Sequence, residues 1–495
     1  MSLEDLPSLG IERPRTHLND QACFDPAAVR NQTDESNEGS GKLRLRVLFI
    51  ALIVALLSYS AGHSKIDDSY IYARYVANAL AGHGLVFNIG DHVNALTSPL
   101  YAYLLLLVSW LLRGNVLLAT VVLSGTFLFL TSIMAERLVA FSGLFIASSA
   151  YFYFLVGMET SLFLFMILVV IVLFEQRRLN WLPLACALLI LSRFEGGALI
   201  VFVAWQCYRR RAWPNWMAFV PAILAAICYL LLNHHYYGAY LPSSATAKLG
   251  QGFSGYWGRW PTAFLGHFTM AELPFQKTKY VMYLVAVFSI TGIAQTFRSS
   301  FSRLVLPFCG ALLTFYILLN LSGLYFWYFA PFILFAILYA CHAIPDNRVA
   351  WITASTLLVL AVLTNTSFLR LGWPEQDRYA GYEDAGNWLA QNTPNNARVE
   401  VAEIGLSGWY SNRQIIDVIG LITPKNSVHI EHHDLVSWLA EDRPDYVLVH
   451  QPSWIWERVA TKSPNYVLLP MRFTGGLVIL ERKSDYTAHE KMVGH

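Results

Sequence analysis

Charged side chains are scarce in this sequence: Asp, Glu, Lys and Arg make up 14% of its 495 residues, whereas apolar residues make up 55%. Soluble domains carry about 25% charged residues, so this composition excludes a water-soluble globular protein of this size. The formal net charge is +2, and the basic residues stand in short, scattered clusters. No nucleic-acid-binding surface is indicated, and the basic clusters are better read as markers of membrane topology.

Two other features are missing. The six cysteines all lie in the amino-terminal tail or within apolar runs, so no disulfide framework is expected. Residues 1–41 contain no early apolar stretch, which a signal peptide would need. We expect residues 1–43 to form a disordered cytoplasmic tail.

Apolar runs fill most of residues 45–366, enough for roughly ten or eleven membrane spans of about 20 residues each. We therefore predict an all-α polytopic membrane bundle of about 11 transmembrane helices over residues 44–366. From residue 367 onward the apolar pattern stops and helix-like and strand-like patterns alternate. This predicts a small α/β domain at residues 367–495, with a helix at 382–391 and strands at 398–403, 414–419, 446–450 and 476–481.

The orientation follows from the basic residues. Lys42, Arg44 and Arg46 directly precede the first apolar run, which places the start of that helix in the cytoplasm. The run at 99–112 is only about 14 residues long, too short to span, and we read it as re-entrant or interfacial. With that choice the clusters near residues 137, 177, 210, 300 and 348 all face the cytoplasm. Exterior segments then lie at 63–114, 157–160, 193–196 and 234–278 and at the turn around 322–323, and the α/β domain is extracytoplasmic.

The first exterior loop offers an acidic pair, Asp67-Asp68. If residues 67–80 are helical, Asp67, Arg74 and Asn78 share one face, and a carboxylate and a guanidinium would look into one cleft. A carboxylate can deprotonate an acceptor hydroxyl while cations steady a phosphate leaving group, which suits group transfer. The alternative is an aspartate that caps the helix beside a surface salt bridge.

Further ionisable residues border the apolar segments. Glu159, Arg193 and Glu195 lie at predicted exterior turns, where a charge is costly unless it is paired or used. They are candidates either for catalysis or for a structural ion pair that locks helices together. Lys248, in the loop at 234–278, suits a phosphate near the membrane surface, or simply reaches toward lipid headgroups.

The first-loop residues form a long signature at fixed spacing. It resembles the first exterior loop of superfamily C (GT-C) glycosyltransferases, which take sugars from polyprenyl phosphate, and most of all the mycobacterial terminal arabinofuranosyltransferase group and related bacterial surface-glycan enzymes. Phe194 stands where that group usually has proline. The residues that carry the resemblance are Asp67-Asp68, Tyr72, Arg74-Tyr75, Asn78, Gly82-His83-Gly84, Asn88, Thr97-Ser98-Pro99, Gly157-Met158-Glu159-Thr160, Arg193, Glu195-Gly196, Tyr236-Tyr237-Gly238, Ala247-Lys248, Ile404-Gly405, Tyr410, Arg413 and Asp417.

The resemblance implies a sugar transfer with inversion, from a polyprenyl-phosphate donor to an extracytoplasmic glycan, glycolipid or protein. Asp67 or Asp68 would be the general base. The resemblance implies no nucleotide, in agreement with the absence of a Gly-rich phosphate loop; no cofactor is assigned, and a divalent cation near the acidic pair is left open. The other residues implied in the site are Arg74, Glu159, Arg193, Glu195, Tyr236, Tyr237 and Lys248 for the donor and its phosphate, with Asn78 and His83 as further first-loop candidates.

Two other functions are compatible with a polytopic chain. A lipid or sugar transporter would place ionisable residues near the bilayer midplane and would use broken helices, whereas the charges here gather at the predicted exterior ends. A membrane-anchored binding protein would need far fewer spans. We expect the protein in the inner (plasma) membrane, with a cytoplasmic amino terminus.

Overall fold

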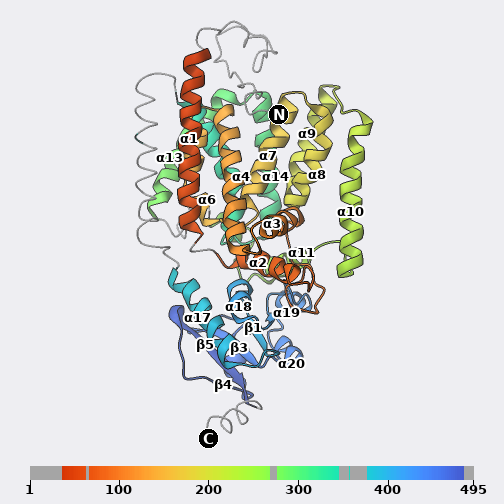
Figure 1. The fold of residues 1–495 in the computed structure, drawn as a ribbon, viewed down its shortest axis with the longest axis vertical. Coiled ribbons are helices and arrows are strands. Elements are labelled where there is room, and N and C mark those ends of the chain that lie inside the picture. The colour runs from red at the N-terminus through yellow and green to blue at the C-terminus, as the bar shows by residue number, and fades with distance from the viewer. Residues whose placement is uncertain (1–35, 63–65, 268–275, 345–355, 357–375, 484–495) are drawn as a thin grey trace.

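The computed structural model describes residues 36–62, 66–267, 276–344, 356 and 376–483. A bundle of helices carries a small α/β domain at one end, and the first helix begins at the other end (Figure 1). The predicted tail falls almost wholly outside the described residues. Its last part does not fit the prediction, because helix α1 (Ser36–Ala61) begins at Ser36, within the segment expected to be disordered.

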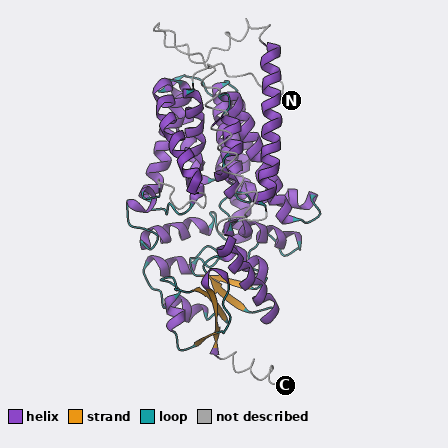
Figure 2. Cartoon of the chain, turned by 90° about the vertical axis from the view of Figure 1, so that its left-hand side faces the viewer, coloured by secondary structure: helices purple, strands orange, loops and turns teal. Residues whose placement is uncertain are grey.

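The long helices of the bundle run between its two ends (Figures 1 and 2). Among the described residues, five helical segments are long and apolar enough to cross a membrane. The run expected after residue 344 lies outside the described residues except for residue 356. The bundle helices besides α1 are α4 (Val116–Leu138), α7 (Thr160–Glu175), α8 (Leu182–Ser192), α9 (Gly197–Arg209), α10 (Phe219–Tyr237), α13 (Gln276–Thr296), α14 (Ser300–Leu318) and α15 (Ala330–Ala343), and between α4 and α7 lie two short buried helices, α5 (Ser142–Ser148) and α6 (Ala150–Phe154).

Shorter helices gather at the end of the bundle that meets the α/β domain (Figure 1). They are α2 (Asp67–Leu80), α3 (Pro99–Leu111), α11 (Ser243–Ser254) and α12 (Thr262–Leu265). Helix α3 matches the run predicted not to span. Its 13 residues reach about 20 Å, against a hydrocarbon core of about 30 Å. Ser98 caps it by accepting a hydrogen bond from the Tyr101 amide, and Pro99 opens its first turn.

The α/β domain is built on a five-stranded sheet in the order β2-β1-β3-β5-β4. The first three of these strands are mutually parallel and β5 is antiparallel to both β3 and β4. The four predicted strands are present with ends shifted by at most two residues, whereas β4 was not predicted because it is a three-residue, partly exposed edge strand. The elements are α17 (Gln376–Asn392), β1 (Arg398–Val401), α18 (Ile404–Ser411), β2 (Gln414–Asp417), α19 (Lys425–Glu431), α20 (Ser437–Asp442), β3 (Tyr446–His450), α21 (Arg458–Lys462), β4 (Tyr466–Leu468) and β5 (Leu477–Arg482).

The two ends of the bundle differ in their polar contacts. At the end where α1 begins, Arg46 pairs with the buried Glu136 of α4 at 2.7 Å, and Arg210 donates a hydrogen bond to Ser300. The predicted exterior segments meet at the opposite end, where Arg193 binds Glu159 and where α2 contacts the α/β domain. The described basic residues Arg46 and Arg210 and the segments predicted to be exterior therefore lie at opposite ends of the bundle, as the sequence predicts.

Candidate functional site

Asp67 binds the amino terminus of α2 to the α/β domain. Both carboxylate oxygens accept backbone hydrogen bonds from the start of α18, at 2.9 Å from the Gly405 amide and at 2.7 Å from the Leu406 amide. A carboxylate at a helix amino terminus is favourable, because the free amides and the helix dipole both attract it. The N-cap residue of α2 is Ile66, so Asp67 does not cap its own helix, although the alternative interpretation expected it to. Asp67 instead caps α18 of the α/β domain.

Arg74 and Asn78 share a face with Asp67, as predicted, but that face does not line a cleft. The Arg74 guanidinium donates to the carbonyls of Phe87 at 2.8 Å and of Arg413 at 2.6 Å, and also to the Gly408 carbonyl. The Asn78 amide donates to loop carbonyls at 2.9 Å. The prediction of a cleft on this face was wrong, because the face packs against α18 and the first loop. Helix α18 is so far from α2 in the sequence that the local spacing of residues could not reveal this contact.

The Asp68 side chain takes no part in the contact between α2 and α18. It is half-buried, and within the described residues its carboxylate makes no hydrogen bond or ion pair. Burial raises the pKa of Asp68 to about 6; the charge of Lys248 acts against this rise, and those of Glu403 and Glu159 add to it. A carboxylate with this pKa that no described residue binds is suited to accept a proton near neutral pH.

Lys248 supplies the cation that faces Asp68. It lies on α11 with its Nζ atom 3.4 Å from the centre of the Tyr325 ring and 6.0 Å from that of Trp327. Burial lowers the pKa of Lys248 to about 8, and Asp68 is the first of the acids whose charge opposes that fall. Among the described residues, the ammonium group is therefore held by ring faces and by no salt bridge, which leaves its charge available to an anion.

Arg193, Glu159 and Glu195 form one ion-pair group at the end of the bundle. Arg193 donates to Glu159 and, at 2.6 Å, to Glu195. Glu159 is 1% exposed and also accepts a hydrogen bond of 3.3 Å from the Thr97 hydroxyl. Both ion pairs that the sequence offered as a structural alternative are present, so the arginine charge is already balanced within the protein.

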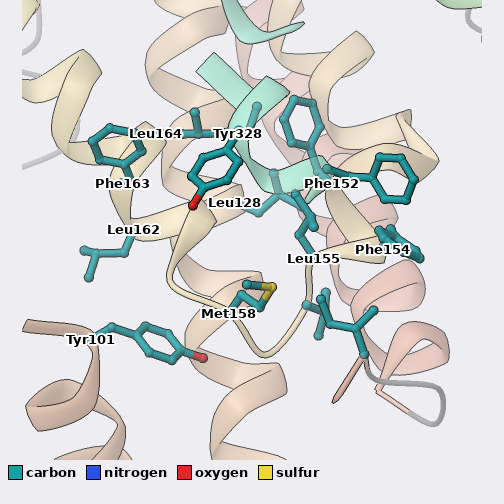
Figure 3. Packing of buried hydrophobic residues seen from close by; sticks show 14 of the residues in the cluster. Tyr101, Leu128, Phe152, Phe154, Leu155, Met158, Leu162, Phe163, Leu164 and Tyr328 are labelled. Carbon is teal, nitrogen blue, oxygen red and sulfur yellow. The ribbon is translucent and has the colours of Figure 1, made fainter. Parts of the chain in front are cut away.

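Apolar packing fixes the turn that carries Glu159. Figure 3 shows Met158 at the bend between α6 and α7, with Tyr101 on one side and Leu155 on the other. The Tyr101 hydroxyl donates to the Gly157 carbonyl at 2.9 Å, and the Gly157 amide donates to the Ser124 hydroxyl at 3.0 Å. Since Gly157 has a φ of +95°, glycine is the residue that fits this turn most easily.

Tyr236 and Tyr237 hold the first loop instead of lining the cluster. The Tyr237 hydroxyl donates to the Leu85 carbonyl at 2.6 Å. The Tyr236 hydroxyl occupies the space where a side chain on Gly84 would begin, and its ring packs against His92 with centroids 4.7 Å apart. His83 is exposed. The structure thus brings Asp68, Glu159, Arg193, Glu195 and Lys248 together, with Asp67 at their edge, and leaves Arg74, Asn78, His83, Tyr236 and Tyr237 in the supporting loop.

Three residues that sequence reasoning did not assign to the site join this cluster. Tyr325 lies under Lys248, and Tyr328 lies 5.5 Å from the Arg193 guanidinium. The third is Glu403, whose charge acts on Asp67, Asp68 and Lys248. A signal was available for Glu403, because it ends a predicted strand and directly precedes the Ile404-Gly405 match.

The residues around the acidic pair do not fit a divalent cation. Both carboxylate oxygens of Asp67 accept backbone amides, which turns them away from a shared metal position. Over the described ranges, the chain has no group of three or more His, Cys, Asp or Glu residues placed to hold an ion. We therefore route no step of the chemistry through a metal.

Comparison with solved structures identifies the fold. ArnT from Cupriavidus metallidurans bound to undecaprenyl phosphate matches with a TM-score of 0.55 at 11% identity, over 88% of this chain and 97% of that one. The apo form of the same protein matches with a TM-score of 0.54 at 11% identity, over 89% of this chain and 98% of ArnT. The chain shares the fold of ArnT. The predicted fold class, a helical membrane bundle followed by a small α/β domain, is confirmed.

Three further findings come from the comparisons with known proteins. The mycobacterial arabinofuranosyltransferase AftD matches with a TM-score of 0.42 at 16% identity, over 89% of this chain and 41% of AftD. Residues 369–490 match a family described as a domain of unknown function, DUF8728. No curated protein sequence matches the chain.

Proposed function

We propose that this protein is a membrane glycosyltransferase that moves a sugar from a polyprenyl-phosphate donor to an extracytoplasmic glycan, glycolipid or protein. The observation that carries the proposal is the Asp68 carboxylate, which has no hydrogen-bond or ion-pair partner among the described residues and faces the Lys248 cation at the end of an apolar bundle. The ArnT structure supports it, since that protein shares the fold and was captured with undecaprenyl phosphate. Arabinofuranose is the sugar we propose, on the loop signature described above.

The reaction is a single displacement with inversion at the anomeric carbon. Asp68 takes the proton of the acceptor hydroxyl as its oxygen bonds to that carbon, and the bond from the carbon to the phosphate oxygen breaks. Its electron pair leaves with the polyprenyl phosphate, whose charge Lys248 balances. Asp67 and Arg74 connect helix α2 to the α/β domain, and the ion pairs of Arg193 stabilise the end of the bundle.

An apolar groove between α8, α9 and α10 supports a donor with a long isoprenoid chain. Its volume is about 420 Å³, which lies in the usual range for small-molecule sites. Phe194 and Leu241 line one end, and Phe194 directly follows Arg193 of the charged cluster. Alanines and cysteines line its walls together with larger apolar residues, which leaves width for a methyl-branched chain. We propose that the chain of the donor lies in this groove while its phosphate reaches Lys248.

The orientation in the membrane is part of the proposal. Basic residues gather at the end where α1 begins, and the positive-inside rule assigns that end to the cytoplasm. The cluster and the α/β domain then face the exterior of the bacterial inner membrane. A transporter is less favoured, because the ion pairs at Arg193 and at Arg46 lie at helix ends rather than in mid-span.

The test is sugar transfer in proteoliposomes that contain the purified full-length protein. The donor is a farnesyl-phosphate arabinofuranose and the acceptor is an octyl arabinofuranoside. We expect transfer by the wild type, loss of transfer in Asp68→Asn, and full transfer in the control Asp384→Asn, which alters an exposed carboxylate on α17. Full transfer by Asp68→Asn would overturn the mechanism. Movement of labelled lipid across the bilayer without any product would instead support a transporter.

A further inference from the structure

Glu403 comes from the α/β domain but lies beside the catalytic residues of the bundle. It follows β1 and directly precedes α18, where it is the N-cap residue. The two amides bound by Asp67 belong to Gly405 and Leu406, immediately after it. A side-chain carbon on Gly405 would overlap the Asp67 carbonyl, so the two helix ends touch at the backbone. This contact fixes the position of Glu403 relative to Asp68.

The local structure does not use the Glu403 carboxylate as a helix cap. No side-chain hydrogen bond caps α18 from this position, and the residue is half exposed. Its charge nevertheless reaches the site: it contributes to raising the pKa of Asp68 and opposes the lowering of the Lys248 pKa. The charged groups that face Asp68 are therefore Glu403 from the α/β domain, Lys248 from α11, and Glu159 with Arg193 from the bundle, beside Asp67 on α2.

The two substrates approach this place from different directions. A lipid-linked donor comes from the bundle, where the apolar groove lies between α8, α9 and α10. In the proposed function a hydrophilic acceptor comes from the water side, which is the side of the α/β domain that contacts Asp67 and Arg74. Glu403 is the acid that this domain contributes beside Asp68, so it stands on the side from which the acceptor enters.

We propose that Glu403 is a specificity-determining residue that orients the acceptor, by accepting hydrogen bonds from hydroxyl groups next to the one that Asp68 deprotonates. The inference rests on the proposed function and deepens it. A carboxylate can only accept hydrogen bonds and a sugar hydroxyl can donate one, and such charge-assisted bonds are stronger than neutral ones. Because Glu403 and Asp68 are fixed to one another through Asp67, both can act on one acceptor molecule at once.

The test compares kinetics of Glu403→Gln with the wild type, with the octyl arabinofuranoside as acceptor and the farnesyl-phosphate arabinofuranose as donor. Losing charge-assisted bonds should raise the acceptor KM about ten- to a hundredfold and leave the donor KM unchanged. Slow hydrolysis of the donor, with water as acceptor, should keep its wild-type rate, and Glu403→Asp should restore part of the acceptor affinity. The acid limb of the pH profile should also move to lower pH, since a negative charge next to Asp68 is removed.

The controls separate the outcomes. Glu431→Gln removes a carboxylate from the exposed end of α19 and should change nothing. An unchanged acceptor KM in Glu403→Gln, or an equal rise in the donor KM, would overturn the role of Glu403 while leaving the glycosyltransferase assignment intact. Absence of Asp68-dependent donor turnover in the wild type, by transfer or by hydrolysis, would overturn both.

Discussion

The two adjacent aspartates should respond differently to the same substitution. Asp68→Asn removes the general base without removing any hydrogen bond that the described structure contains. General-base catalysis contributes about 10² to 10⁴ in rate, so kcat should fall by that factor while the melting temperature stays the same. Transfer is measured in proteoliposomes, and melting of the purified protein is followed by tryptophan fluorescence.

Asp67→Asn acts on the contact between the domains. The carboxylate accepts from two buried amides, at 2.9 and 2.7 Å, and an asparagine keeps only one accepting oxygen. Loss of one charge-assisted bond costs about 1.5 to 3 kcal/mol, so the melting temperature should drop, with a smaller loss of kcat than in Asp68→Asn. The reasoning is refuted if Asp67→Asn is inactive at unchanged melting temperature while Asp68→Asn keeps a tenth or more of the activity.

Three further predictions concern pH, metal and the donor chain. The rate of transfer should be highest between about pH 6, above which Asp68 is deprotonated, and about pH 8, above which Lys248 loses its charge. In a pH–rate profile, Lys248→Arg should shift the alkaline limit upward, because arginine keeps its charge. An unshifted limit would contradict this assignment. Incubation with EDTA should leave the rate unchanged, because the acidic pair offers no cation site; a loss restored by Mg²⁺ or Mn²⁺ would show otherwise. Ala226→Trp, in the groove, should raise the donor KM and leave the acceptor KM unchanged, whereas Leu224→Trp, outside the groove lining, should change neither; an unchanged donor KM in Ala226→Trp would argue against the groove.

Patterns that are local in the sequence predicted much of this protein. The hydropathy pattern located the bundle, and its breakdown after residue 366 separated the α/β domain, because a bilayer and a soluble sheet demand different side chains. The short run at 99–112 was recognised from length alone. The ionisable residues at the predicted exterior turns were expected to be paired or used, because charges beside apolar helices are rarely left unpaired, and the structure pairs Arg193 with Glu159 and Glu195.

Partners distant in the chain could not be predicted in the same way. Asp67 and the Gly405 amide are 338 residues apart in sequence, and no periodicity within the first loop reveals such a contact. The helical spacing correctly placed Arg74 on the face of Asp67, but it could not show that a second domain covers that face. For the same reason, the sequence left the choice between Asp67 and Asp68 open.

The contact between helix α2 and the α/β domain also determines how the function of that domain can be tested. Deleting it would remove the two amides from the buried Asp67 and two of the carbonyls that Arg74 binds. A buried charge that loses its partner costs about 3 to 5 kcal/mol, so the first loop would rearrange and activity would be lost even if the domain touched no substrate. Inactivity of a truncated chain therefore says nothing about acceptor binding. Single substitutions at Glu403, which leave the contacts of Asp67 and Arg74 in place, separate a role in the site from a role in holding the loop.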